Sequence, residues 1–278
     1  MKAGKWGRDK KRAVSKKQIR LVSGLLCVLF LAGEQGMKAE AEAAAPVRVS
    51  RVETTVSSVE EAKAVVSNAI QTHTDYIRLE GGGSAYGALG SLVTQELYAP
   101  LHSYEGATLC GIQVAQKGDL CVVQLKRVST VEEENAVDAI VAQYIPLLQG
   151  MSTQEQIIAV HDFICNQVTY SDETALGNAD FSSAYDGLAS GQGVCTTYAL
   201  LFQKFMDQIG IPCYVATGNV RGTGHAWNVV NVDGSWYHVD CTWDDQSYGI
   251  IYNWCLAGAD RAGYASWGGV VLAETSLD

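Results

Sequence analysis

The dipeptide Asp233-Gly234 limits the fold of this chain more than any other feature, because it separates two runs in which apolar and polar residues alternate. Asp-Gly between alternating runs is among the strongest short-range signals for a β-hairpin with a two-residue turn. We therefore predict antiparallel strands over residues 225–232 and 235–242. In this hairpin Val232 faces Ser235, and the residue numbers of every further facing pair add up to 467.

This register brings two titratable side chains together. His225 faces Thr242 and Asp240 faces Trp227, which makes His225 and Asp240 diagonal neighbours on one face of the hairpin. Cβ atoms in this relation lie about 7 Å apart or less, so the two side chains can form a hydrogen bond. A carboxylate in this position fixes the imidazole tautomer, stabilises the protonated ring and leaves the other ring nitrogen for a thiol.

A cysteine at a helix start supplies the thiol. The run Gly191–Val194 is loop-like, and Cys195 opens an amphipathic helix that Gly210 and Pro212 bring to an end. The first turn of a helix and a neighbouring imidazolium both favour a thiolate nucleophile. We therefore predict Cys195 as the nucleophile, His225 as the general base and Asp240 as the residue that orients the base.

Two other roles for the residues of the hairpin, a different base and a zinc site, have less support from the sequence. His238 shares the strand face of Asp240 and competes for it, but it lacks the glycine-flanked, accessible position of His225. A zinc site would take Cys213, His225, His238 and Cys241. That site is disfavoured because His238 and Cys241 point to opposite faces of one strand. We expect no metal ion and no cofactor.

The remaining histidines and the acidic pair after the hairpin have structural interpretations. His73, His102 and His161 lie in contexts typical of structural histidines. Asp244-Asp245 indicates a solvated turn, because no calcium-loop spacing surrounds it. The aromatic residues of the hairpin are predicted to line the core and a groove, with Trp227 as a candidate substrate contact.

Five runs, in order and spacing, resemble the bacterial transglutaminase-like domain family: Ala184–Leu188, Gly193–Ala199, Gly210–Tyr214, His225–Val229 and Trp236–Asp245. Upstream, His161–Phe163 and Val168–Asp172 are similar to the lead-in helix of that family, so the resemblance covers roughly residues 154–246. It implies a papain-like α+β fold, in which a nucleophile-bearing helix packs on an antiparallel sheet. It also implies acyl transfer from a carboxamide, through a thioester, to an amine or to water.

Two departures from the family leave the three predicted catalytic residues in place. Thr197 stands where the family often has glycine, which changes how the nucleophile helix packs, and a late histidine is missing after Gln246. Activity is therefore expected despite the departures. The oxyanion of the reaction would be held by the backbone N–H of Cys195, with Gln192 as a candidate second donor.

The N-terminus is typical of an export signal. Nine of the 20 Lys and Arg residues fall within the first twenty positions, followed by the apolar run Leu21–Ala32 and an alanine-rich stretch. The apolar run is shorter than the roughly 20 residues of a membrane span. We predict that residues 1–45 are a signal peptide, with an uncleaved N-terminal anchor as the alternative, and that the protein is secreted or associated with the cell envelope.

The net charge of the chain limits which molecules it can bind. Cleavage near Ala45 would leave 10 basic and 26 acidic residues, a net charge of −16. Such a body repels phosphate backbones and anionic lipids, which argues against nucleic acid and leaves membrane contact to the N-terminal segment. The expected partner is a protein or peptide substrate, cell-wall peptides included.

Cysteine usage fits export. Seven cysteines remain without Cys27, and an odd number in an exported protein indicates one reactive thiol. The others either form disulfides or are small buried thiols, and the sequence leaves both open. Cys110 and Cys121 are the most favoured pair, since Gly118-Asp119 could turn the chain between two β-like stretches.

Before the catalytic region, residues 46–150 are predicted to form a small N-terminal α/β region of unknown role. Capping boxes at Ser57–Glu60 and Ser152–Glu155 predict helix starts, and the glycine-rich run Glu80–Gly87 predicts a loop without phosphate-loop chemistry. Strands are expected near 111–115 and 120–126, and a helix over 131–148 that Pro146 ends or kinks. Residues 151–278 would be the catalytic domain.

The sequence therefore predicts an exported, cysteine-dependent acyl-transfer enzyme. Its substrates would be Gln or peptide amides of proteins or cell-envelope peptides, and crosslinking, deamidation and proteolysis all fit. The rival hypothesis is a non-catalytic cell-surface binding module that keeps the same fold. The intact set of Cys195, His225 and Asp240 favours the enzyme.

Overall fold

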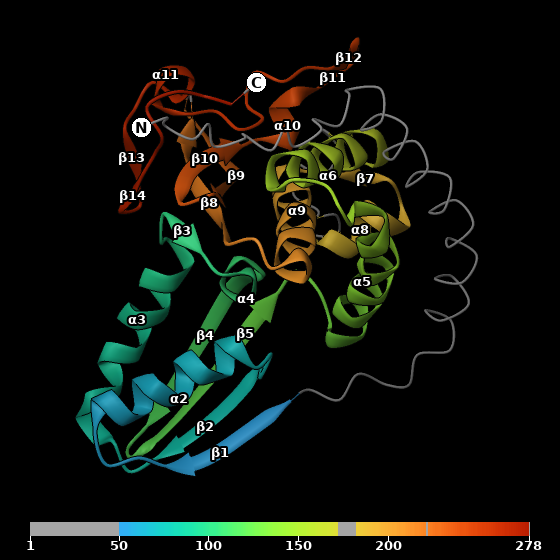
Figure 1. Cartoon of the computed structure of the whole chain (residues 1–278). Coiled ribbons are helices and arrows are strands. Elements are labelled where there is room, and N and C mark those ends of the chain that lie inside the picture. Colours follow the sequence, from blue (N-terminus) through green and yellow to red (C-terminus); the bar gives the residue numbers. More distant parts are fainter. Residues whose placement is uncertain (1–49, 172–181, 221, 278) are drawn as a thin grey trace, which may run out of the picture.

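The structure, a computed structural model, describes residues 50–171, 182–220 and 222–277. It contains two four-stranded sheets, one built from the first part of the chain and one mostly from the second (Figure 1). The predicted signal segment, residues 1–45, lies outside the described residues. Within the described ranges, no helix is long and apolar enough to span a bilayer.

The first sheet has the strand order β1-β2-β5-β4, in which β1 and β2 are parallel and the other neighbours antiparallel. Its strands are β1 (Arg51–Thr55), β2 (Tyr76–Glu80), β4 (Leu109–Lys117) and β5 (Leu120–Arg127). Helices α2 (Val59–Gln71) and α3 (Gly87–Leu97) supply side chains to one hydrophobic cluster with this sheet (Figure 1). The predicted strands near 111–115 and 120–126 are confirmed.

One local prediction in this region needs correction, and another is made more specific. The cap of α2 is Ser58, whose side chain accepts a hydrogen bond from the N–H of Glu61, so the helix begins one residue later than the capping box indicated. The glycine-rich run contains a 3₁₀ turn, η1 (Gly83–Tyr86). Its Tyr86 side chain is buried and accepts a hydrogen bond from Gly82 N–H, which orders the turn.

The second sheet has the order β10-β9-β8-β3, all antiparallel. Its strands are β3 (Leu101–His102), β8 (Cys213–Val220), β9 (Thr223–Val232) and β10 (Ser235–Val239). The predicted hairpin register is confirmed, because Ser235 pairs with Val232 and Val239 with Asn228. Asp233 and Gly234 both have positive φ, 51° and 90°, as a type I′ turn requires.

The second hairpin strand is shorter than predicted. It ends at Val239, and Cys241–Asp244 forms the short helix α10. Asp240 causes the change, since its side chain accepts a hydrogen bond from the N–H of Trp243 and so caps the new helix.

Helix α9 (Cys195–Ile209) is the centre of the larger core and packs on β8 and β9, with α5, α6 and α8 around it (Figure 1). The remaining helices of the described residues are α4 (Tyr104–Ala107), α5 (Val131–Tyr144), η2 (Ile145–Leu148), α6 (Thr153–Gln167), α8 (Ala184–Ala189) and α11 (Ala259–Ala262). Short strand pairs complete the part of the chain described: β6 (Thr169–Tyr170) with β7 (Gln192–Gly193), β11 (Asp245–Gln246) with β12 (Gly249–Ile250), and β13 (Ser266–Trp267) with β14 (Val270–Val271). The capping box at Ser152 is confirmed, and α5 gives way to the 3₁₀ turn that contains Pro146.

Both halves of the chain contribute to the larger core. Strand β3 pairs with β8 of the second sheet, and side chains of Tyr104 and Val137 belong to the cluster around α9. The boundary at residue 150 stays a prediction, and the packing couples the region before it to the helix that carries Cys195.

The predicted disulfide between Cys110 and Cys121 is wrong, since both thiols are free. The turn prediction itself was sound, because β4 and β5 are joined at Gly118-Asp119. The register, however, pairs Cys121 with Gln116, near the turn. Cys110 lies at the other end of β4, where the register shifts between Leu109 and Gly111, so the two cysteines are separated along the hairpin.

Candidate active site

Cys195 is the first residue of α9 and is half-buried. Val194, at the N-cap, makes no side-chain hydrogen bond to the helix, so no capping side chain occupies the helix N-terminus beside the thiol. The partial positive charge of that N-terminus favours an anion there. A half-buried cysteine at such a position is suited to nucleophilic chemistry.

Thr197, the departure from the family pattern, fits because two glycines leave room for it. A Cβ atom added to Gly193 would lie 2.5 Å from the Thr197 side chain, and one added to Gly187 would lie 2.7 Å from Thr197 Cγ2. Helices α8 and α9 and strand β7 therefore meet closely around the threonine. The departure changes the packing without displacing Cys195 from the start of its helix.

His225 and Asp240 form the predicted pair. The distance from His225 Nε2 to Asp240 Oδ2 is 2.7 Å, and the other carboxylate oxygen, Oδ1, accepts a hydrogen bond from the N–H of Trp243 at 3.1 Å. Asp240 is buried, with 4% of its surface exposed. The carboxylate is thus fixed by one ring and one backbone group, and it leaves Nδ1 of His225 for another partner.

That partner is the Cys195 thiol, and its effect is visible in the protonation of the ring. Burial lowers the pKa of His225, but the hydrogen bond to Asp240 and then the one to Cys195 raise it more, to about 9. His225 is therefore an imidazolium at neutral pH. Burial raises the pKa of Asp240, while the His225 hydrogen bond lowers it. A bond of 2.7 Å to a cation supports the carboxylate form at pH 7.

Two indole rings flank the imidazole. Trp243 stacks on His225 with centroids 4.9 Å apart and an interplanar angle of 18°, and Trp227 stacks at 5.8 Å and 19°. An aromatic face attracts a cation, so both contacts favour the protonated ring. Trp227 is only 5% exposed, so it supports the imidazole from within the core more than it lines an open groove.

His238 is occupied elsewhere. Its Nδ1 accepts a hydrogen bond from Nε1 of Trp227, and burial lowers its pKa to about 4, so the ring is neutral at pH 7. His225, not His238, is hydrogen-bonded to Asp240. The geometry therefore supports the sequence-based choice between the two histidines.

Gln192 lies on the short strand β7, exposed and three residues before Cys195. Its backbone N–H donates to Ser190 Oγ at 3.2 Å, which holds the approach to the helix. The role of Gln192 as an oxyanion donor stays a prediction.

A hollow of about 240 Å³ lies near the start of α9, although none of Cys195, His225 and Asp240 lines it. Its walls include Thr196 and Ala226, the chain neighbours of Cys195 and His225, together with His102 and Leu109 from the first half of the chain. Burial lowers the pKa of His102, which keeps that ring neutral at pH 7. Among the described residues, this lining contains no Asp, Glu, Lys or Arg. The hollow is suited to an uncharged side chain.

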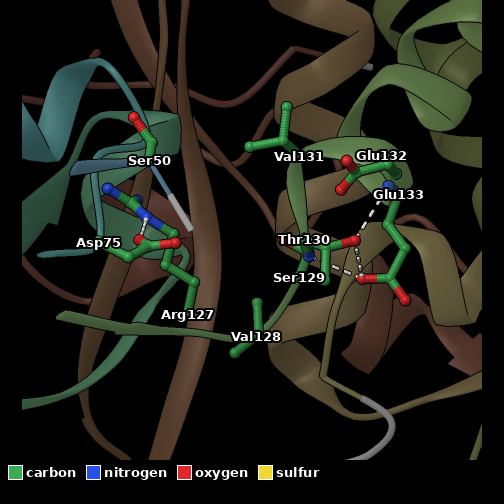
Figure 2. Close-up of a pocket in the computed structure, with 9 residues that line it drawn as sticks. All are labelled: Ser50, Asp75, Arg127, Val128, Ser129, Thr130, Val131, Glu132 and Glu133. Carbon is green, nitrogen blue, oxygen red and sulfur yellow. Dashed lines mark hydrogen bonds and ion pairs between the residues drawn. The ribbon is translucent and has the colours of Figure 1, made fainter. Parts of the chain in front are cut away.

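A second hollow of about 240 Å³ lies at the start of α5 (Figure 2). Arg127 points toward Asp75 there, with Nε 2.9 Å from Oδ1, and Glu133 caps the helix against Thr130 (Figure 2). None of Cys195, His225 and Asp240 lines it. Arg127, the one cation among the described residues of its lining, is paired with Asp75, and the hollow is separate from the candidate site.

The sequence analysis missed a buried polar cluster behind the site. His161 Nδ1 lies 3.2 Å from Asp162 Oδ1, and His161 Nε2 lies 3.2 Å from Asp244 Oδ2, with His161 and Asp244 fully buried. The interpretation of Asp244 as part of a solvated turn is therefore wrong. Its carboxylate accepts two hydrogen bonds from Trp254 N–H, both 3.1 Å, in addition to the ion pair.

Burial works against protonation of His161, yet neighbouring cysteine thiols and the two carboxylates raise its pKa well above the ordinary value. The signal for this cluster was present in the sequence, since His161-Asp162 and Asp244-Asp245 belong to the family-like runs. Nothing local linked the two dipeptides.

Comparison with known proteins finds similarity in the part of the chain that contains the candidate site. Residues 142–241, which include Cys195, His225 and Asp240, match the Transglutaminase-like superfamily. Kyphoscoliosis peptidase from Mus musculus is 29% identical over 110 residues, 35% of this chain and 17% of the mouse protein. The Homo sapiens protein is 30% identical over 131 residues, 41% of this chain and 19% of the human one. The chain spans less than a fifth of either relative.

Solved structures show partial likeness at low identity. A TGase aligns with a TM-score of 0.38 and 16% identity, over 62% of this chain and 52% of that structure. A candidate cysteine protease from Cytophaga hutchinsonii aligns with a TM-score of 0.34 and 16% identity, over 51% of this chain and 64% of the other.

Proposed function

We propose, with the transglutaminase-like domain of residues 142–241 as the premise, that this protein is an enzyme that transfers acyl groups from amides through a cysteine thioester. The observation that carries the proposal is the position of His225. Its ring is hydrogen-bonded to Asp240 on one side and contacts the Cys195 thiol on the other. A thiol, an imidazolium and a buried carboxylate in this order are the parts that thiol-dependent acyl transfer needs.

In the acylation step, the Cys195 thiolate attacks the carbonyl carbon of an amide and forms a carbon–sulfur bond. The backbone N–H of Cys195 stabilises the oxyanion, and we assign Gln192 as the second donor. Imidazolium His225 gives its Nδ1 proton to the leaving nitrogen as the carbon–nitrogen bond breaks. The products are a thioester on Cys195 and a free amine or ammonia.

In the deacylation step, His225 is neutral and acts as the base. It takes a proton from water or from a primary amine while that nucleophile attacks the thioester. The carbon–sulfur bond breaks, and the thiolate–imidazolium pair is restored. Asp240 keeps its hydrogen bond to Nε2 throughout, so that Nδ1 always faces the reacting atoms.

We further propose a Gln side chain or a peptide amide, in a protein or a cell-envelope peptide, as the substrate. Thr196 and Ala226, which follow Cys195 and His225 in the chain, line a hollow whose described lining contains no Asp, Glu, Lys or Arg, and this supports a neutral side chain over an acidic or basic one. The basic-then-apolar N-terminus supports a place of action outside the cytoplasm.

Mass spectrometry of a Gln-containing peptide, incubated with the protein and a labelled primary amine, tests the proposal. Amine incorporation would indicate crosslinking, a gain of about 1 Da would indicate deamidation, and shorter products would indicate proteolysis. All three must disappear in Cys195→Ala. If the wild type turns over no peptide but still binds peptides, and Cys195→Ala binds them equally, the protein is the non-catalytic cell-surface binding module.

A further inference from the structure

Three metal-ligating side chains converge in the core behind the candidate active site. His161 and Cys165 lie one turn apart on α6, and Cys241 is the first residue of α10. Their donor atoms, His161 Nε2 and the two Sγ atoms, all lie within 4.8 Å of one another. All three residues are buried, with exposed fractions of 0%, 6% and 2%. None of the three belongs to the proposed catalytic set.

We infer that His161, Cys165 and Cys241 form a binding site for a thiophilic transition-metal ion, with Zn²⁺ as the first candidate. In a tetrahedral zinc site with Zn–S of about 2.3 Å and Zn–N of about 2.0 Å, neighbouring nitrogen and sulfur ligands are about 3.5 Å apart. The distance from Cys165 Sγ to His161 Nε2 is 3.8 Å. A shift of a few tenths of an ångström brings this pair to ligand spacing.

The surroundings of His161 match those of a metal-binding histidine. A metal-bound imidazole usually directs its other ring nitrogen to a carboxylate, which fixes the ring. Here Nδ1 of His161 lies 3.2 Å from Asp162 Oδ1, and Asp162 Oδ2 accepts a hydrogen bond from Tyr252 Oη at 3.0 Å. The ring is therefore held with Nε2 on the side of Cys165, 3.8 Å from its Sγ, and of Asp244, 3.2 Å from its Oδ2.

Asp244 lies beside His161 but outside the group of donor atoms that are all within 4.8 Å of one another, so it would have to move toward the thiols to serve as a fourth ligand. Its Oδ2 is 3.2 Å from His161 Nε2, close to the spacing of about 3.4 Å between nitrogen and oxygen ligands of zinc. If the ion instead recruits the buried Cys255 thiol, Asp244 keeps both hydrogen bonds from Trp254 N–H. Either way, the loss of the Asp244 contact to His161 leaves no carboxylate oxygen of Asp244 without a partner.

The donor set selects the class of ion. Thiolates with an imidazole favour zinc or copper(I), whereas magnesium and calcium require oxygen ligands. Binding of Zn²⁺ by two thiols and an imidazolium forms two metal–sulfur bonds and one metal–nitrogen bond, and it releases three protons to the solvent. No oxidant or reductant takes part.

The ion would tie α6 to α10, the helix that starts directly after Asp240. It would therefore fix the segment from which Asp240 reaches His225. The sequence expectation of no metal missed this group because Cys165 and Cys241 are 76 residues apart. The inference is independent of the proposed enzyme activity, since a binding module of the same fold would hold the ion as well.

Metal analysis of the whole chain, purified under reducing conditions without a histidine tag, tests the site. After refolding with Zn²⁺ and removal of unbound zinc, we expect elemental mass spectrometry to find about one zinc ion per chain. Refolding with Co²⁺ should give a thiolate-to-cobalt charge-transfer band, which reports sulfur ligation without any variant. Cys165→Ser and Cys241→Ser should each lose most of the metal and most of the band.

Cys213→Ser is the matched control, because Cys213 is buried in the same hydrophobic core but is not one of the three ligands. It should keep both metal and band. Two results would overturn the inference. One is folded wild-type protein that binds no metal and gives no cobalt band, although all of its cysteines react as free thiols once the protein is denatured. The other is a mass lower by about 2 Da with a Cys165–Cys241 crosslinked peptide, which would make the pair a disulfide.

Discussion

Two clusters of cysteine, histidine and aspartate side chains meet at one peptide bond, since Asp240 belongs to the first and Cys241 to the second. The first comprises Cys195, His225 and Asp240, and the second comprises Cys165, His161, Cys241, Asp162 and Asp244. In both, an imidazole lies between carboxylate and thiol. They differ in access, because Cys195 is half-buried while His161 is fully buried.

The comparison shows that a thiol that ionises readily is not reactive unless a substrate can reach it. Burial raises the pKa of Cys165, but the contacts with Cys241 and His161 lower it, and the result is about 7. A thiol with that pKa would still be a poor nucleophile here, because no substrate reaches a buried sulfur at the end of α6. Cys195, at the start of its helix, has the access that Cys165 lacks. The same residue types thus have a proposed catalytic role in one cluster and a buried, structural position in the other.

The largest expected effect is the loss of turnover in Cys195→Ala. Without the nucleophile no thioester forms, so the rate with a Gln peptide should fall by about 10⁴-fold or more. Cys121→Ala, in the first sheet, is the control and should keep the wild-type rate. Residual turnover within about tenfold of wild type in Cys195→Ala would assign the nucleophile to another residue.

Alkylation of the folded protein tests the difference in access directly. Iodoacetamide should label Cys195 within minutes and reach Cys165 and Cys241 only after unfolding, as peptide mapping would show. Rapid labelling of Cys165 in the folded state would mean that the second cluster is open, and the contrast between the two clusters would fail.

Asp240→Asn should lower turnover by about 10³- to 10⁴-fold while the chain stays folded, as the loss of the orienting carboxylate does in other triads. The pH profile gives a second readout. The pKa of His225 is about 9, so activity that needs the imidazolium should fall as the pH rises past that value. Without the carboxylate the pKa of His225 falls, and this alkaline limb should move to lower pH. An unchanged limb would exclude the ion pair with His225.

His161→Gln should act on stability more than on chemistry. It removes a cation from between two buried carboxylates, and breaking a buried ion pair costs about 3–5 kcal/mol. Denaturant unfolding with chelator present would measure the loss apart from any metal. His225→Gln is the matched variant, and because it leaves one buried carboxylate unpaired instead of two, it should lose activity with a smaller change in stability. Equal stability loss in both would erase the distinction between the clusters.

The first cluster was predictable because one turn determines its register. Asp233-Gly234 fixes the facing pairs of β9 and β10, and that register places His225 beside Asp240 without any long-range information. The position of Cys195 at the start of α9 also followed from its place before an amphipathic run, and its role as nucleophile stays a prediction. What the hairpin argument missed is the end of β10, where Asp240 caps a helix and stops the strand.

The second cluster was not predictable in the same way. His161 and Asp244 come from separate elements, and neither dipeptide carries a local pattern that requires the other. Two adjacent aspartates after a strand resemble a solvated turn, and only the packing of α6 against α10 buries Asp244. The free state of Cys110 and Cys121 also depends on register, since the turn was right and the positions along the strands were not.

A third histidine, His238, gives the smallest and most graded prediction, because it opposes His225 in its response to pH. Its folded-state pKa is about 4, below the usual 6.5, because burial disfavours the charged ring. Below pH 6.5 the unfolded chain therefore binds a proton at this position that the folded chain refuses. The stability that neutral His238 provides is complete above pH 6.5 and is lost as the pH falls toward 4. A depression of about 2.5 pKa units corresponds to roughly 3 kcal/mol.

Thermal unfolding between pH 7 and pH 4 should show this loss of stability in the wild type. His238→Gln, which keeps a hydrogen-bond acceptor for Trp227, should show a shallower dependence of stability on pH. Equal slopes would mean that His238 is protonated in the folded protein, and the hydrogen bond from Trp227 to Nδ1 could not exist.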